Sequence, residues 1–176
     1  MTRPSQVHPS GSRSLLLPIL LLGIGASFTS MNARSADTIS GTATVVDAGT
    51  LKIQGKKVRL HGIEAPDDDQ VCLRDAKPWK CGEAAATALR HHIDGKTVSC
   101  EAVTGKDGSN AGANCSADGK NLNTLLVREG WATDLKSESD GAYADAQKEA
   151  KKARRGIWAT DTDNPEEVRR QGKRND

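Results

Sequence analysis

Two short acidic stretches hold residue types that could bind a metal ion. In VVDAGTLKI, residues 45–53, Asp47 and Thr50 occupy a turn between two runs rich in β-branched residues. An acidic turn of this kind offers oxygen ligands to a hard divalent cation, but the position before Thr50 is Gly49, which has no side chain to coordinate it. The second stretch, residues 67–69, is three consecutive aspartates. Such a run is more typical of a solvated turn than of a metal site.

The histidines do not add a metal site. His61 alternates with Arg59 on a predicted strand, so both side chains face the same side of it. A single histidine on a strand is more often a packed or surface residue than a ligand. His91 and His92 are adjacent on a predicted helix and cannot share one face, which excludes them as a metal pair.

The four cysteines, Cys72, Cys81, Cys100 and Cys115, indicate disulfides. Zinc sites favour closer C-x-x-C pairs or histidines at ligand spacing, and neither occurs in the sequence. Three pairings are possible. We favour Cys72 with Cys81 and Cys100 with Cys115, because each closes a short loop and the second joins two predicted neighbouring strands.

Residues 1–36 have the layout of a secretory signal. A basic, acid-free start leads into the apolar run LLLPILLLGIGASF, residues 15–28, which is shorter than the ~20 residues that a spanning helix needs. We expect cleavage near residue 36, with a retained membrane anchor as the alternative. No cysteine follows the run closely, which disfavours a lipid anchor.

The charge balance does not indicate a binder of nucleic acid. Residues 1–36 hold three of the 25 basic residues and none of the 23 acidic ones, so the remaining chain has a net charge of −1. A protein that binds the phosphate backbone usually carries a strong positive footprint. Here basic residues are concentrated only in one short stretch, KEAKKARRG at residues 148–156.

The predicted elements form a β-β-β-α-β-β core followed by two helices. Three strands lie between residues 38 and 63, with a tight hairpin at Gln54-Gly55. A loop follows, then further elements: a helix at 81–95, strands at 96–103 and 112–117, and helices at 121–132 and 141–158, the last ending at Gly156. This order predicts an α+β fold: a five-stranded Greek-key barrel of the OB-fold type with three helices. The predicted domain covers residues 37–160, and residues 161–176 form a polar tail.

Five stretches resemble one known family. VVDAGTLKI, KKVRLHGIEAPDDDQVC, WKCGEAAATALRHHIDGKTVSC, DGKNLNTLLVREGWA and ARRGIW follow one another in the order and spacing of the thermonuclease, or staphylococcal-nuclease-like, family. The resemblance covers roughly residues 39–158. It implies the OB-fold barrel and, for active members, a calcium-dependent phosphodiesterase in which carboxylates and a carbonyl hold the metal, a glutamate assists water and two arginines clamp the phosphate.

The resemblance assigns roles to several residues of this chain. Arg59 matches the first arginine of the clamp, and Glu64 matches a metal-binding aspartate. Thr50 is retained at the metal, and Asp47 matches a structural position. The general-base position falls on Asp67, one methylene shorter than the family glutamate, with two further aspartates beside it.

The sequence also departs from the family pattern at critical positions. A primary aspartate ligand is replaced by Gly49, and the second arginine falls on Asn110. Lys106 could supply a charge near the substrate, although an ammonium cannot reproduce a bidentate fork on phosphate. Base-stacking aromatic positions fall on three non-aromatic residues, Gly108, Lys136 and Glu138. Losing one charge-stabilising group costs about 10²- to 10³-fold in rate, so efficient cleavage is not expected.

Three functions therefore compete. The first is an exported family member, periplasmic or secreted, with a degenerate site, weak or absent calcium binding and a residual binding role. The second is a slow divalent-metal nuclease that uses Thr50, Arg59, Glu64 and residues 67–69. The third is a disulfide-stapled envelope module that contacts proteins. The expected partners are single-stranded nucleic acid or nucleotides, bound weakly, or envelope proteins, and the expected state is a monomer.

Overall fold

The computed structural model describes residues 37–75 and 77–159. The predicted signal segment, residues 1–36, and the polar tail, residues 161–176, lie outside the described residues. Within the described part, no helix is long and apolar enough to cross a membrane.

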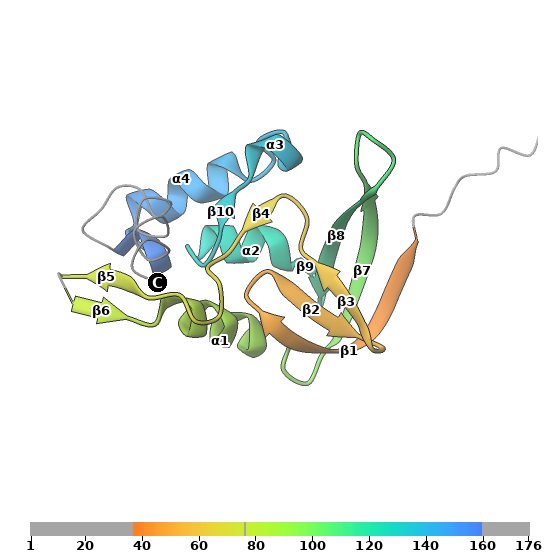
Figure 1. Ribbon diagram of the computed structural model, residues 1–176, viewed down its shortest axis with the longest axis horizontal. Helices are drawn as coiled ribbons and strands as arrows, with labels where there is room; N and C mark the ends of the chain where they lie inside the picture. Colours follow the sequence, from red (N-terminus) through yellow and green to blue (C-terminus); the bar gives the residue numbers. More distant parts are fainter. Residues whose placement is uncertain (1–36, 76, 160–176) are drawn as a thin grey trace, which may run out of the picture. The chain divides into compact units, whose positions relative to one another are not determined.

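The described residues build an antiparallel six-stranded sheet in the order β3-β2-β1-β7-β8-β9 (Figure 1). Its strands are β1 (Thr38–Asp47), β2 (Thr50–Ile53), β3 (Lys56–Arg59), β7 (Thr97–Thr104), β8 (Asn110–Ala117) and β9 (Lys120–Asn121). β1 is long enough to pair with a different strand along each half of its length. Its first half pairs with β7 and its second half pairs with β2, with an irregularity in the register between Val45 and Asp47.

The sheet curls so that its end strand β3 approaches β8, the strand next to the other end. Leu60, directly after β3, forms a parallel bridge with Ala113 of β8. The His61 amide donates to the Ala113 carbonyl at 2.9 Å, and the Leu60 amide donates to the Gly49 carbonyl at 2.8 Å. The predicted α+β fold with an antiparallel sheet is confirmed, and the barrel-like curl depends on this one bridge among the described residues.

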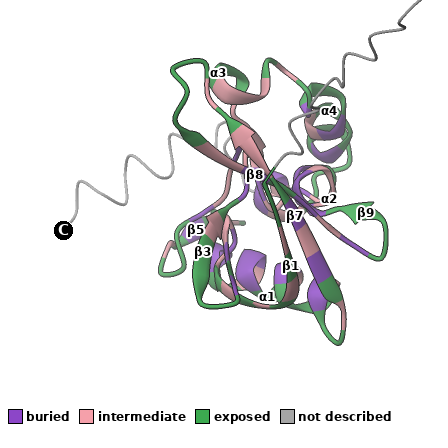
Figure 2. Cartoon of the chain, turned by 90° about the vertical axis from the view of Figure 1, so that its right-hand side faces the viewer, coloured by how far each residue is buried: buried purple, intermediate pink, exposed green. Residues whose placement is uncertain are grey.

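The helices pack on this sheet and leave the core between them. They are α1 (Cys81–Ile93), α2 (Leu122–Arg128), α3 (Lys136–Ser139), α4 (Ala144–Lys152) and a 3₁₀ turn, η1 (Gly156–Ala159). Figure 2 shows buried segments on α1, α2 and α4. Large buried side chains from both layers form the core, among them Leu51, Leu60, Leu89, Leu122 and Leu126. Asn121 caps α2, as its side chain accepts from the Thr124 amide at 2.8 Å.

The prediction of three helices is wrong by one. The segment expected to be one helix at 141–158 is divided into α4, which ends at Lys152, and the 3₁₀ turn η1, which begins at Gly156. Beyond it Arg154 has a φ of 51°, and a Cβ on Gly156 would lie 2.3 Å from the Gly130 carbonyl oxygen. The chain leaves the helix there because it must pass against Gly130. α3 is a separate short helix, ended by Asp140 in a left-handed conformation.

Two small ribbons occupy parts of the chain that we expected to be irregular. β4 (Ile63–Glu64) pairs with β10 (Thr133–Asp134), and β5 (Cys72–Arg74) pairs with β6 (Lys77–Trp79). Strands of two or three residues are too short to show an alternating pattern in the sequence. The ribbons matter for the site, because β4 carries Glu64 and its partner strand leads into α3.

Both predicted disulfides are confirmed. Cys100 and Cys115 are directly opposite each other on β7 and β8, with 4.0 Å between their Cα atoms. Cys72 and Cys81 join β5 to the start of α1, with 5.6 Å between their Cα atoms. Each closes a short loop, which in the loop-entropy view stabilises the folded state by about 3 kcal/mol.

Candidate active site

Arg59 ends β3 and lies opposite Thr50 of β2. Its guanidinium Nη2 donates to the Ala111 carbonyl at 3.0 Å and forms an ion pair and hydrogen bond with the carboxylate of Glu138 on α3. The arginine side chain is 44 % exposed and the glutamate side chain is 31 % exposed. The predicted phosphate clamp is thus already bound to a carboxylate and a carbonyl of the protein.

Glu138 has further partners around Arg59. Its Oε2 accepts from the Gly62 amide at 3.3 Å and lies 3.8 Å from Nδ1 of His61. Partial burial acts to raise the pKa of Glu138, but the hydrogen bond and charge of Arg59, the Gly62 amide and the charge of His61 outweigh burial and hold the pKa below its ordinary value of 4.5. Glu138 is therefore a carboxylate at neutral pH. Sequence reasoning placed it at an aromatic position and missed this pairing.

His61 is a packed residue, as the sequence interpretation favoured. Its Nδ1 lies 2.9 Å from the Ala111 carbonyl, which can only accept, so Nδ1 carries the proton. Its own carbonyl accepts from Asn123 at 3.0 Å and from the Tyr143 hydroxyl at 3.4 Å. These contacts hold His61 between the barrel and the helices.

The turn between β1 and β2 keeps its shape. Oδ1 of Asp47 accepts from the Gly49 amide at 2.8 Å, and this bond closes the turn before Thr50. A Cβ on Gly49 would lie 3.6 Å from that Asp47 oxygen and 3.7 Å from the Cβ of Ala65, which are ordinary contact distances. The turn therefore faces the segment that carries Glu64, and it has room for a side chain that the sequence does not supply.

Glu64 comes to the same side of the molecule through β4. Its backbone pairs with Thr133, whose Oγ1 donates to the Glu64 carbonyl at 3.3 Å. One region of the molecule thus holds the turn at Gly49, the paired residues Thr50 and Arg59, and the β4 segment that carries Glu64. This is the arrangement that the resemblance implies. The roles that the sequence analysis assigned to these residues stay predictions.

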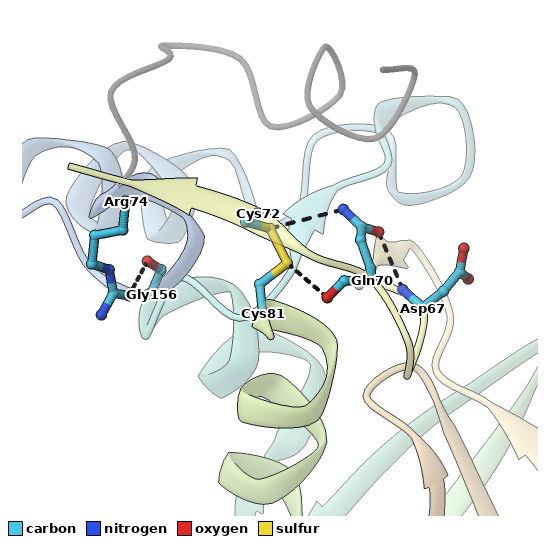
Figure 3. The surroundings of a disulfide bond; sticks show 6 residues. All are labelled: Asp67, Gln70, Cys72, Arg74, Cys81 and Gly156. Atoms are coloured by element: carbon cyan, nitrogen blue, oxygen red, sulfur yellow. Dashed lines mark hydrogen bonds between the residues drawn. A yellow bond between two sulfur atoms is a disulfide. The ribbon is translucent and has the colours of Figure 1, made fainter. Parts of the chain in front are cut away.

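Asp67 belongs to a loop that is fastened to the start of α1 rather than to the other site residues (Figure 3). Its amide donates to Gln70 Oε1 at 3.3 Å, and its carbonyl accepts from the Gln70 amide at 2.9 Å. The Gly82 amide in turn donates to the Gln70 carbonyl at 3.1 Å. A Cβ on Gly82 would lie 1.7 Å from the Asp67 carbonyl oxygen, so only glycine permits this close approach.

The disulfide of Cys72 and Cys81 supports this loop from the other side. Figure 3 shows Gln70 between the disulfide and Asp67, with its carbonyl 3.4 Å from Cys81 Sγ. The side chains of residues 67–69 are all exposed. The loop is firmly anchored, but its carboxylates face solvent.

The residues present do not form a calcium site. Among the described residues, no three His, Cys, Asp or Glu side chains are grouped so that they could hold a metal ion. Calcium requires six to eight oxygen ligands. Glu64 and the backbone at Thr50 cannot provide such a set while Gly49 is in the turn, so we derive no catalytic step through a metal.

Neither Asn110 nor Lys106 is placed to take over the phosphate-binding role of the missing second arginine. Asn110 begins β8, and its Oδ1 accepts from the Gly112 amide at 2.8 Å. Lys106, in the hairpin between β7 and β8, pairs with Asp140 at 3.2 Å, and both side chains are largely exposed. Such a pair contributes little energy, and the lysine is directed to α3 rather than to Arg59.

The aromatic side chains of the described residues are packed. Trp158 is buried beside the Cys72–Cys81 disulfide, with Trp79 packed against the same cluster, while Tyr143 is buried in the main core and Trp131 packs against it. Arg74 covers the Trp79 ring at 3.9 Å.

Comparisons with known proteins agree with the geometry. The family model described as staphylococcal nuclease homologue matches residues 57–160. Succinoglycan biosynthesis protein ExoI of Rhizobium meliloti is 35 % identical over 139 residues, 77 % of this chain and 72 % of that protein. Probable endonuclease LCL3 of Schizophyllum commune is 33 % identical over 128 residues, 62 % of this chain and 42 % of that protein. The chain therefore belongs to the staphylococcal nuclease homologue family.

Proposed function

We propose that this protein is an exported member of the family whose phosphodiesterase site is degenerate, so that cleavage of DNA or RNA is weak or lost. The pairing of Arg59 with Glu138 carries this proposal. A phosphate that approached Arg59 would have to displace a carboxylate already bound to it. At about 5 Å and an effective dielectric constant near 20, that carboxylate would also repel a phosphate charge by about 3 kcal/mol.

Two further features support the same proposal. Gly49 removes a carboxylate from the metal-binding turn, and Asn110 is folded back on its own backbone. An asparagine cannot donate the two parallel hydrogen bonds that an arginine offers to phosphate. The Gly49 change thus removes a ligand for the cation, the Asn110 change removes a positive charge, and Glu138 adds a negative one, so each weakens the stabilisation of a phosphodiester transition state.

Export is part of the proposal. Its support is the signal-like sequence of residues 1–36 and the two disulfides, which persist in oxidising compartments. We propose a periplasmic or secreted location, with removal of residues 1–36 on export. Fractionation of cells that express the full chain, with N-terminal sequencing of the product, tests both points.

The degenerate site is tested by calorimetry on the purified protein with calcium, alone and with a nucleoside 3′,5′-bisphosphate. We expect no calcium-dependent heat and no strengthening of calcium binding by the nucleotide. Cleavage of denatured DNA is measured in parallel. Cleavage that disappears on chelation and in Arg59→Ala would overturn the proposal and establish the slow nuclease that relies on Thr50, Glu64 and the loop of Asp67.

A further inference from the structure

A groove with a volume of about 550 Å³ opens beside β3. Its lining includes Arg59 and Asn110, the two positions assigned to the phosphate clamp, and none of the turn at residues 47–50. Its walls are β3, the start of β1 at residues 37–40, and the start of β8. Gln54 closes one end by donating from Nε2 to the Ser40 carbonyl at 2.9 Å. Arg59 closes the other by donating to the Ala111 carbonyl. The size lies within the range of about 300–1,000 Å³ that is usual for ligand sites.

The backbone of β3 presents a strand edge to this groove. β3 is the end strand of the sheet and pairs with β2 on one side. Peptide groups alternate in direction along a strand. The Leu60 amide points to Gly49, on the β2 side, and the His61 amide points to Ala113 of β8. Lys57 and His61 are four residues apart, so their backbone N–H groups point to the same side of the strand. The N–H and C=O of Lys57 therefore face away from β2.

The tight turn before β3 supports this assignment. Gln54 and Gly55 have φ values of 49° and 81°, as in a two-residue type I′ hairpin. In such a hairpin the residues that flank the turn, Ile53 and Lys56, exchange hydrogen bonds with each other. Lys57 must then point outward. The exposed side chains of β3 agree with an accessible edge (Figure 2).

The groove has an apolar floor and a positive rim. Ile39, Val58 and Ala113 line it and belong to, or pack against, the main core. Lys56 and Lys57 are exposed on its rim and take part in no ion pair among the described residues. The charge of Arg59 is offset by Glu138, and Asp37 also lines the groove, so the two lysines leave one net positive charge to attract an anionic occupant.

We propose that this groove binds an acidic, extended peptide segment of a partner protein, which adds a strand to the outer edge of β3. Main-chain hydrogen bonds at Lys57 would supply affinity, the apolar floor would accept every second side chain, and the lysines would pair with the acidic residues between them. Lysines on an edge strand discourage pairing with uncharged strands, whose approach would desolvate the ammonium groups, and repel basic strands, which leaves an acidic strand as the favoured occupant.

The lining argues against nucleic acid as the occupant. None of the described residues that line the groove is aromatic. Single-stranded nucleic acids gain about 1–3 kcal/mol per base from stacking on aromatic side chains. A strand edge recognises peptide groups instead, and neither a base nor a sugar offers the regular series of amides that would pair with it.

The test uses a fluorescein-labelled octapeptide of alternating valine and glutamate, titrated against the full protein by fluorescence anisotropy at low salt. The double variant K56E/K57E should weaken binding by about tenfold or more, because each exposed charge pair contributes up to about 1 kcal/mol. The matched control is Lys120→Glu on β9, outside the groove, which should leave the affinity unchanged. Hydrogen exchange of the Lys57 amide should slow when the peptide binds.

Two further comparisons separate strand addition from simple charge attraction. The same peptide N-methylated at every residue should lose binding, because it keeps its charges and has no amide donors. Lys57→Pro should also lose binding, since it removes an outward N–H that β2 does not use. If that variant fails to fold, the N-methylated peptide gives the same information.

The proposal is overturned by any of three results: no measurable binding of the alternating peptide, equal binding of its N-methylated form, or equal affinity in K56E/K57E. Octathymidylate and a polyuronate of similar charge serve as competing probes. Binding of either as tight as that of the peptide, with the same dependence on the two lysines, would show that the groove takes anions of another class and would also overturn it.

Discussion

The guanidinium of Arg59 and the carboxylate of Glu138 are bound to each other, although the two residues are separated by 79 positions in the sequence. The pair joins the end of β3 to α3, and the Gly62 amide holds the carboxylate in place. In this way Glu138 offsets the charge of Arg59, the residue that the sequence analysis assigned to the phosphate clamp. The pair also fixes α3 against the barrel, so it has a structural effect as well as a functional one.

The stability of the protein should depend on pH through Glu138. Its pKa is lowered in the folded state, so the pair stabilises the fold above the ordinary value of 4.5, and this contribution is lost as the pH falls through the lowered folded pKa. Glu138→Gln should lower the free energy of unfolding by about 1 kcal/mol or less at pH 7, and the difference from the original protein should vanish in acid.

Urea unfolding at pH 7 and at pH 3 measures this difference. Glu101→Gln is the matched control, because Glu101 is exposed on β7 and takes part in no ion pair with another described residue. A stability loss in Glu138→Gln that is the same at both pH values would show that the carboxylate charge is not what holds the pair together.

Restoring the missing groups should restore chemistry. Gly49→Asp fits, because a Cβ there meets only ordinary contacts and the backbone φ is not left-handed. Combined with Asn110→Arg, it should raise calcium-dependent cleavage of denatured DNA by about 10²-fold or more. Adding Glu138→Gln should raise it further by freeing Arg59. Gly49→Asn with Asn110→Gln, which match the shapes without the charges, should give no gain.

The outcome shows whether the assignment of catalytic residues or the assumed position of the metal is wrong. If the charged variants fold, bind calcium and still do not cleave, the assignment of Glu64 and Asp67 to the reaction is wrong. If they fold and do not bind calcium, the turn at Gly49 and the segment of Glu64 do not face one metal position.

Local patterns in the sequence were enough to predict most elements near the site. The hairpin at Gln54-Gly55 requires two positive φ values, and the cap at Asn121 and the two disulfides each depend on residues close in sequence. The Arg59–Glu138 pair was missed because it depends on where α3 lies, and α3 is positioned by β10 and β4. Its only sequence signal was an acid at a position where the resemblance implies an aromatic residue.

The disulfide of Cys72 and Cys81 should stabilise the loop of Asp67 locally, in addition to stabilising the whole fold. Replacing both cysteines by alanine should lower the free energy of unfolding by about 2–3 kcal/mol and speed hydrogen exchange of the Gly82 amide, which donates to Gln70 in that loop. Replacing Cys100 and Cys115 should have a similar cost in stability without selective loss of protection at Gly82. Equal protection of Gly82 in both variants would mean that the close contact of Gly82 with Asp67 holds the loop unaided.

Asn123 should be the most sensitive polar residue in the core. It is fully buried on α2 and binds three backbone groups, two of β8 and one of the turn after β3. Its Oδ1 accepts from the Cys115 amide at 3.1 Å, and its Nδ2 donates to the His61 and Ala113 carbonyls at 3.0 and 3.2 Å. Asn123→Leu keeps the volume and removes these three bonds. The Ala113 carbonyl still accepts from the His61 amide and the His61 carbonyl from the Tyr143 hydroxyl, whereas the Cys115 amide loses its bond to Asn123. A buried group without a partner costs about 1–3 kcal/mol, so we expect a loss in that range.

The Asn123 bonds lie beside the bridge that joins β3 to β8, so the loss should be accompanied by local opening. Hydrogen exchange should report faster exchange of the His61 amide, which donates across that bridge, while amides of α1 change only with global unfolding. Thr124→Val, one position along α2, is the control and should leave His61 protected. If Asn123→Leu changes neither the urea midpoint nor the protection of the His61 amide, the three backbone groups tolerate the loss of their partner. Apolar packing alone would then hold β3 against β8.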